Sequence, residues 1–394
     1  MMNVNGTAIS PSSSLLRALA AWRRQKSLLV GLALAALSPA SFSAGPNDPL
    51  VIGQTYVGSG PLAGLSTEPV LGIRAMFDSV NANGGVLGRR IEIRHADDGF
   101  DGERAAENVR KFAQSGVLAV IMPIGHSSSV GALKAANENK IPLVAPYSGA
   151  AAVVKFSEYG FPLRIGYEEE YERIVAHLFT LGINRIVFAY ADTPGARAAM
   201  EVTRRSIELR GHKLLGSVVV KQDGSDALDK ARELSVLKAQ TVVLSLANSV
   251  AAPFIQGYRA SGGAASFYSF SFLDGPSLYK AIGTDAADVV VSQVVPYPWG
   301  KSLPLIADYR NAMQKAGAKN LSYGSLEGYI AAKTLVEALK RAGPNPTPTT
   351  VKRALESFGS LDLGGLQVRY GPGEHAGLMY SELTLIRRDG GYAR

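Results

Sequence analysis

Residues 117–150 contain two continuous apolar runs separated by a helical pattern, and this stretch constrains the fold more than any other. The runs are 117–122 and 141–145, and neither alternates between apolar and polar residues. Continuous runs are typical of parallel strands that are covered on both faces, and a parallel pair needs a crossover that is usually a helix. The stretch therefore predicts a strand–helix–strand unit within an α/β fold.

Small hydroxyl residues and glycine follow both predicted strands. Ser127 and Ser128 open the helix after the first strand, and Tyr147, Ser148 and Gly149 form the turn after the second. In an open parallel sheet, ligands bind beyond the carboxyl ends of the strands, where N-terminal N–H groups of helices are unpaired. We therefore expect these two turns to hold an anion such as a carboxylate. The alternative for each serine is a simple helix N-cap.

Strand and helix patterns alternate on both sides of this unit. The patterns form two arrays of similar size, which predict two doubly wound lobes. A helix is predicted at 69–83, and 161–165 and 289–300 suit crossovers between the lobes. Further strands are predicted at 50–56, 91–98, 185–191, 213–220, 241–247 and 267–272. We predict a first lobe at 48–165 plus 292–362 and a second lobe at 166–291 plus 363–394, with a hairpin at 363–377 opening the last segment.

The first 43 residues form a separate segment. Basic residues precede an apolar run at 27–37, and small residues follow it. The run is too short to span about 30 Å of hydrocarbon, so the pattern predicts a signal peptide at 1–43 rather than a membrane helix. We expect cleavage after Ser43 or Ala44 and a protein that resides in the periplasm.

Charge and cysteine content exclude several kinds of protein. Without residues 1–43, 37 basic and 33 acidic residues remain, a formal charge of +4 against +8 for the full chain. No basic strip interleaved with aromatic residues occurs, so no nucleic acid partner is expected. The chain has no cysteine, which excludes disulfides, thiolate metal sites and a cysteine nucleophile.

No catalytic motif appears in the sequence. The histidines have neither an i, i+4 partner nor another metal-ligand spacing, and there is no nucleophile elbow, P-loop or dinucleotide fingerprint. We therefore expect no enzyme activity, no cofactor and no metal. The histidines are His95, His126, His177, His212 and His375.

Seven segments together resemble type I periplasmic solute-binding proteins of the leucine/isoleucine/valine-binding protein family. These proteins serve ABC importers of branched-chain amino acids and amides, and the likeness extends over about residues 48–394. The segments are SGPLAG (59–64), NANGGVLGRRIEI with DD (81–98), GHSSS (125–129), IPLVAPYSGA (141–150), RIVFAYADTPG (185–195), SLEGYIAAKTLVEAL (325–339) and LGGLQVRYGPGEHAG (363–377).

The resemblance implies two lobes, joined by three crossovers, that close on a ligand whose carboxylate meets the first lobe. It implies a ligand side chain beside Leu65 and an acid of the second lobe at Glu169 or Glu170. Arg164, Tyr167 and Glu170 follow a spacing found in part of the family. The residues that would hold the carboxylate are His126, Ser127, Ser128, Tyr147, Ser148 and Gly149.

Two departures from the family pattern leave the ligand open. Pro194 stands where amino-acid binders usually have a tyrosine, and the second acid falls between Ser271 and Asp274. Amino acids, amides and aromatic acids all remain candidates. We expect a monomeric receptor that delivers a small carboxylate-bearing metabolite to the permease of an ABC transporter. The alternative is a sensor that presents its closed form to a membrane kinase or chemoreceptor.

Overall fold

The computed structural model describes residues 1–3, 48–60 and 62–394. The chain divides into two compact units, residues 1–45 and 46–394, and the description below concerns the second. Apart from its first three residues, the predicted signal peptide at 1–43 lies outside the described residues. Among those residues, no helix combines the length and apolar character needed to cross a membrane.

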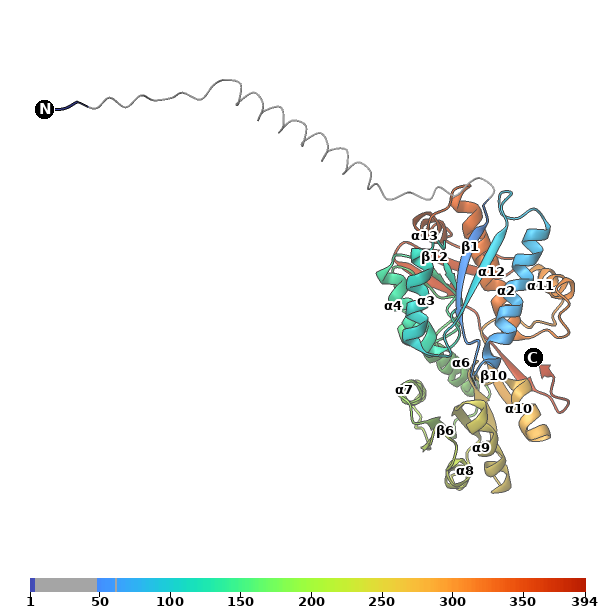
Figure 1. Ribbon diagram of the computed structural model, residues 1–394. Helices are drawn as coiled ribbons and strands as arrows, with labels where there is room; N and C mark the ends of the chain where they lie inside the picture. Colours follow the sequence, from blue (N-terminus) through green and yellow to red (C-terminus); the bar gives the residue numbers. More distant parts are fainter. Residues whose placement is uncertain (4–47, 61) are drawn as a thin grey trace. The chain divides into compact units, whose positions relative to one another are not determined.

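The first lobe is built on a five-stranded parallel sheet with the order β2-β1-β3-β4-β5. In Figure 1, β1 is seen between α3 and α2. The predicted strand–helix–strand unit is confirmed as β3, α4 and β4, although both strands are shorter than predicted. The strands are β1 (Leu50–Tyr56), β2 (Ile91–Asp97), β3 (Val120–Ile121), β4 (Leu143–Val144) and β5 (Gly160–Phe161). The helices between them are α2 (Gly64–Ala82), α3 (Gly102–Gln114), α4 (His126–Glu138) and α5 (Ala151–Val154).

The second lobe is built on a seven-stranded sheet with the order β15-β14-β10-β9-β8-β6-β7. Strands β6 to β10 are parallel, whereas β14 pairs with β10 in the antiparallel sense. The strands are β6 (Ile186–Ala191), β7 (Gly216–Val220), β8 (Thr241–Ser245), β9 (Ser266–Ser269), β10 (Val289–Gln293), β14 (Glu382–Ile386) and β15 (Tyr392–Ala393). The helices are α6 (Tyr167–Thr180), α7 (Pro194–Glu208), α8 (Ala227–Ser235), α9 (Asn248–Ala260) and α10 (Gly275–Ile282), followed by a 3-10 turn at Gly283–Ala286.

The chain then returns to the first lobe through three more helices and a small sheet. Helix α12 lies along α2, and glycines in both helices permit a close approach of their backbones. A Cβ atom at Gly72 would lie 1.8 Å from the carbonyl oxygen of Ser325, and one at Gly328 would lie 2.1 Å from that of Pro69. The helices are α11 (Pro304–Lys315), α12 (Tyr323–Ala342) and α13 (Pro348–Glu356), and the small sheet consists of β11 (Leu361–Asp362), β12 (Gln367–Gly371) and β13 (Glu374–Leu378).

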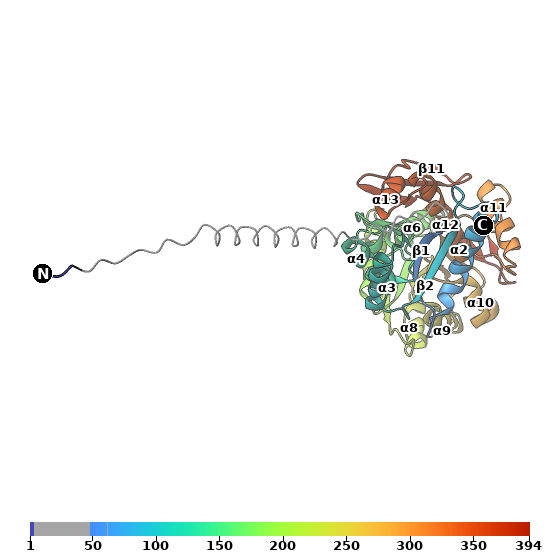
Figure 2. The same ribbon diagram turned by 45° about the horizontal axis from the view of Figure 1, so that its top comes forward.

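The β12–β13 hairpin belongs to the first lobe, which corrects the predicted placement of residues 363–394. Val368, Tyr370 and Leu378 lie in the first lobe's core. Strand β11 of the same small sheet is seen near α13 in Figure 2. The hydroxyl of Tyr370 donates to the carbonyl oxygen of Pro162 at 2.9 Å. The hairpin therefore caps the edge of β5, and only β14 and β15 reach the second sheet.

Two doubly wound α/β lobes joined by three crossovers make up the described fold, as predicted. The crossovers are residues 162–166 between β5 and α6, 294–303 between β10 and α11, and 379–381 between β13 and β14. We propose 48–165 plus 292–380 as the first lobe and 166–291 plus 381–394 as the second.

Candidate functional site

The turn that opens α4 places Ser128 against a buried carboxylate of the protein itself. The Ser128 hydroxyl donates to Oδ1 of Asp98 at 2.8 Å, and Oδ2 accepts from the hydroxyl of Thr55 at 2.7 Å. All three side chains are buried. The Ser128 hydroxyl is therefore engaged within the first lobe, and the charge of Asp98 already stands beside the N-terminus of α4. At the same turn His126 is exposed and Ser127 is half-buried.

The turn after β4 lies against the second lobe. Ser148 is buried, and its hydroxyl oxygen accepts from the N–H of Ala150 at 3.3 Å. The carbonyl oxygen of Gly149 accepts from the N–H of Tyr167 at 2.8 Å. A Cβ atom at Gly149 would lie 2.6 Å from the Tyr167 ring, so glycine makes room for this tyrosine at the start of α6.

A buried arginine joins three elements beside this turn. The Arg164 side chain is 4% exposed. Its Nε and Nη2 donate to the two carboxylate oxygens of Glu327 on α12, at 2.8 and 2.6 Å. Its guanidinium also lies 4.6 Å from the ring centre of Tyr147. Burial acts to lower the pKa of Arg164, but the charge and hydrogen bonds of Glu327, together with Tyr167 and Tyr147, raise it above its ordinary value, so the first crossover keeps a permanent positive charge.

Glu170 bonds to the second lobe's own backbone and reaches toward this arginine. Its carboxylate accepts from the N–H of Ser271 at 2.9 Å and from the Ser271 hydroxyl at 2.8 Å. The Arg164 Nη1 donates to the same hydroxyl at 3.5 Å, a long contact between the crossover and the second lobe. Glu170 is fully buried, and burial raises its pKa to about 6 although the positive charge of Arg164 acts in the opposite direction.

The pKa of Glu170 gives a prediction for stability. The native pKa of about 6 exceeds the ordinary value of 4.5, so between these values the native state holds a proton that the unfolded state has released. The free energy of unfolding then falls as pH rises through this window. Relative to Glu170→Gln, we expect the parent protein to lose about 2 kcal/mol between about pH 4 and pH 7, as measured by urea unfolding.

The exposed neighbour Glu168 on the same helix provides a matched control for this prediction. Glu168→Gln should follow the parent protein across the whole pH range, because an exposed side chain does not pay the same desolvation cost. A difference between the parent protein and Glu170→Gln that does not change with pH would contradict the assignment.

Glu169 is turned away from this network. Its carboxylate pairs with Arg173 one turn along α6 at 2.5 Å. Arg173 in turn donates to the hydroxyl of Ser381 at 3.0 Å, so this pair reaches the third crossover. Of the two glutamates predicted as ligand acids, Glu170 is bonded to Ser271 and Glu169 to Arg173.

Two carboxylates of different lobes, Glu68 on α2 and Asp274 before α10, interact with each other. Burial raises the pKa of Glu68, and the negative charge of Asp274 raises it further. Oε2 of Glu68 is inaccessible and has no hydrogen-bond partner among the described residues. Asp274 is exposed, and its Oδ2 accepts from the N–H of Ser277 at 2.9 Å as the N-cap of α10. The Asp274 carboxylate of the second lobe therefore lies close enough to the Glu68 side chain of the first lobe to disfavour its ionisation.

Aromatic rings from three segments lie next to the acids. Tyr323 at the start of α12 is 5.4 Å from Tyr392 and 5.8 Å from Trp299, measured between ring centres. The Tyr392 hydroxyl accepts from the N–H of Gly275 at 3.1 Å, directly after Asp274. These rings connect the second crossover, the first lobe and the last strand.

Some of the predicted site residues lie close together in the structure, whereas others are far from them. Tyr147, Gly149, Tyr167 and Glu170 lie around the first crossover. Leu65 and Pro194 are exposed near the starts of α2 and α7, in different lobes. The ligand-binding role of all these residues stays a prediction.

The sequence did not predict Glu68 as a site residue, and it did not predict the ion pair between Arg164 and Glu327. An acid near the start of a helix usually compensates the helix dipole, so nothing in the sequence distinguished Glu68. In the described residues, no group of three or more His, Cys, Asp or Glu side chains is arranged to hold a metal ion.

The family described as periplasmic binding protein matches residues 49–389, nearly the whole region outside the predicted leader. The chain belongs to this family. It is a family of solute-binding proteins, not of enzymes. The chain is also similar to Leu/Ile/Val-binding protein homolog 1 of Brucella melitensis, with 25% identity over 343 residues that cover 85% of this chain and 89% of that protein.

Solved periplasmic binding proteins share the fold. An extracellular ligand-binding receptor from Verminephrobacter eiseniae is 27% identical with a TM-score of 0.79, and the match covers 88% of this chain and all of that one. A substrate-binding periplasmic protein from Ralstonia solanacearum is 28% identical with a TM-score of 0.77, and the match covers 87% of this chain and 99% of that one. A fatty acid ABC transporter substrate-binding protein from Thermomonospora curvata is 19% identical with a TM-score of 0.75, and the match covers 89% of this chain and 92% of that one. At this identity the likeness shows only that the two chains share a fold.

Proposed function

We propose that this periplasmic binding protein captures a small carboxylate-bearing metabolite between its lobes and delivers it to the permease of an ABC importer. The observation that carries the proposal is the meeting of the lobes at the carboxyl ends of β4 and β9, where Gly149 contacts Tyr167 and Arg164 contacts Ser271. Ligands of open parallel sheets bind at such ends. Function then comes from a higher affinity of the closed state for the ligand, not from bond chemistry.

The charge between the lobes favours one class of ligand among the candidates. Glu68 and Asp274 repel each other across the lobes, and a positively charged group between them would remove that repulsion. We therefore propose an amino acid, whose ammonium group approaches these acids while its carboxylate meets the first-lobe turns. The residues proposed for the carboxylate are His126, Ser127, Tyr147 and Gly149, while Ser128 and Ser148 support the turns from within.

Isothermal titration against amino acids, amides and aromatic acids tests this function. We expect heat of binding with at least one amino acid, and none with the matching acid that lacks the amino group. Ser127→Ala should weaken binding by roughly 1 to 3 kcal/mol if its hydroxyl bonds the ligand carboxylate. Silence across the whole panel, together with a native mass spectrum free of bound ligand, would contradict the proposal.

A charge-neutral variant separates ligand recognition from folding. Asp274→Asn keeps an N-cap acceptor for α10 but removes the charge, so it should weaken amino-acid binding without changing stability. Asp229→Asn is the matched control, because Asp229 is an exposed residue on helix α8 of the same lobe. Equal affinities in both variants would move the ammonium site away from Asp274.

The proposal also includes export of the protein to the periplasm, with cleavage of the signal peptide, and a monomeric state there. The intact mass of the protein recovered from the periplasm should correspond to a chain that begins after Ser43 or Ala44. Sedimentation of that protein should give the mass of one chain. A protein that retains residues 1–43 would contradict the predicted cleavage.

A further inference from the structure

Three loops meet at one edge of the second sheet, at the amino ends of its strands. Residues 181–185 enter β6, 209–215 enter β7 and 236–240 enter β8. Because β6 pairs in parallel with both β7 and β8, these loops are neighbours. The Arg185 guanidinium donates to the carbonyl oxygens of Leu237 and Lys238, at 3.2 Å each. We call the surface of these three loops the basic edge.

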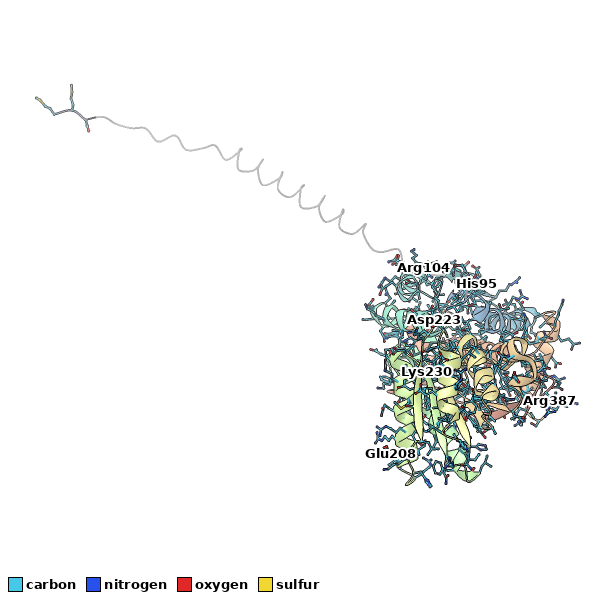
Figure 3. The ribbon with its side chains drawn as sticks, turned by 90° about the horizontal axis from the view of Figure 1, so that it is seen from below. His95, Arg104, Glu208, Asp223, Lys230 and Arg387 are labelled. Atoms are coloured by element: carbon cyan, nitrogen blue, oxygen red, sulfur yellow. The ribbon has the colours of Figure 1, made fainter. Side chains whose placement is uncertain are left out.

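Large aliphatic side chains protrude from the basic edge. Single exposed apolar residues are normal on a protein surface, but neighbouring ones form a patch that usually marks an interaction site. Here every loop contributes at least one, and Leu209 follows Glu208 at the periphery of the second lobe (Figure 3). Their exposed fractions are 56% for Leu181, 77% for Leu209, 40% for Leu215, 71% for Val236 and 37% for Leu237.

The charge of the basic edge has one sign. Its loops contain four cationic residues and no aspartate or glutamate. The nearest acid in sequence, Glu208, is paired with Arg204 at 2.7 Å. Glu233, three residues before Val236, is paired with Lys230 at 2.8 Å. Asp285 and Asp288 lie farther along the same edge of the sheet, before β10. The four cations are Arg185, Arg210, Lys213 and Lys238, and all four are exposed.

We propose that the basic edge binds the surface of an anionic phospholipid bilayer. Exposed lysine and arginine together with protruding aliphatic side chains form the combination that holds a protein in the headgroup region of a membrane. A protein partner is less well matched, because the three loops lack the tryptophan and tyrosine that concentrate binding energy in protein interfaces.

The position of the basic edge is compatible with membrane binding by a protein that also binds a ligand. The candidate ligand site lies at the carboxyl ends of the parallel strands, and the basic edge lies at their amino ends. Contact with a membrane would therefore leave the ligand site accessible. The proposal rests on the periplasmic location of the family, next to a membrane, and does not depend on which ligand is bound.

Vesicle sedimentation tests the proposal with the chain recovered from the periplasm. We expect binding to vesicles of phosphatidylcholine with about a third phosphatidylglycerol, at least about tenfold stronger than to phosphatidylcholine alone. Raising NaCl from about 0.05 to 0.5 M should remove most of it, because salt screens the lysine and arginine charges. Lys213→Glu with Lys238→Glu should reduce binding by about tenfold, and Leu209→Ser with Val236→Ser by a similar factor.

Matched variants elsewhere on the surface are the controls. Lys301→Glu with Lys319→Glu changes the net charge equally on exposed residues of the other lobe. Leu228→Ser removes a leucine of α8 that is 55% exposed but lies outside the basic edge. Both should bind the anionic vesicles as the parent does. Mass spectrometry of every protein ensures that all share the same N-terminus.

Several results would overturn the proposal. They are failure of the parent to bind anionic vesicles at low salt, equal binding to both kinds of vesicle, or an equal loss in the control variants. A dimer that Leu209→Ser dissociates in analytical ultracentrifugation, without vesicle binding, would make the basic edge an interface between copies of this chain. Each of these results would leave the ligand titrations unaffected.

Discussion

Replacing Arg164 with methionine is expected to lower the free energy of unfolding by about 3 to 5 kcal/mol. The substitution leaves the Glu327 carboxylate buried without its two charge-assisted hydrogen bonds, at 2.8 and 2.6 Å. It also removes the cation above the Tyr147 ring and the contact with Ser271. Urea unfolding of the purified protein measures the loss.

Two further variants show whether burial of the charge is the cause. Arg164→Met with Glu327→Leu removes both charges and should recover a large part of the loss, because a buried ion pair replaced by apolar side chains is often close to neutral. Arg204→Met breaks a surface pair with Glu201 and Glu208 and should leave the unfolding curve unchanged. If Arg164→Met unfolds at the same urea concentration as the parent, the buried pair has no role in stability.

Replacing Gly72 with alanine is expected to cost about 3 kcal/mol or more. The new Cβ atom would lie 1.8 Å from the carbonyl oxygen of Ser325 on α12, and a backbone atom cannot rotate away as a side chain can. Helices α2 and α12 must then separate. Because α2 carries Leu65 and Glu68, we also expect weaker ligand binding. Urea unfolding and isothermal titration measure the two effects.

Gly64 is the matched control for this second prediction. It begins the same helix, and a Cβ atom there would have no atom within 4 Å. Gly64→Ala should therefore leave stability unchanged or slightly raised, since alanine favours helix more than glycine does. An unfolding curve of Gly72→Ala that overlays the parent curve would show that the two helices do not depend on this close approach.

Local sequence patterns were sufficient to predict most of the fold. Continuous apolar runs identified the parallel strands, and their alternation with helices identified two lobes. The strands predicted at 117–122 and 141–145 end before Met122 and Ala145 because these residues adopt positive φ angles, which end the extended conformation. Both strands also begin later than predicted, at Val120 and Leu143. Helix α2 begins five residues before Pro69, the predicted start, and α11 was not predicted.

The partners of site residues could not be predicted, because they depend on contacts between distant parts of the chain. Arg164 and Glu327 are separated by 163 positions, and no local pattern connects them. The same limitation affected residues 363–378, whose hairpin form was predicted but whose lobe was not. Predicted residues at Tyr147, Gly149 and Tyr167 do lie together, because strand ends in a parallel sheet share one edge.

The close packing of α12 on α2 has a consequence for the order in which the protein can fold. Strand β1 and helix α2 are made early, yet the helix that covers them ends only at Ala342. Contacts between segments so far apart in sequence form slowly, since a long loop must close first. A growing chain therefore keeps its early apolar segments uncovered until late in synthesis. This delay would suit a chain that has to pass through a secretion channel before it folds.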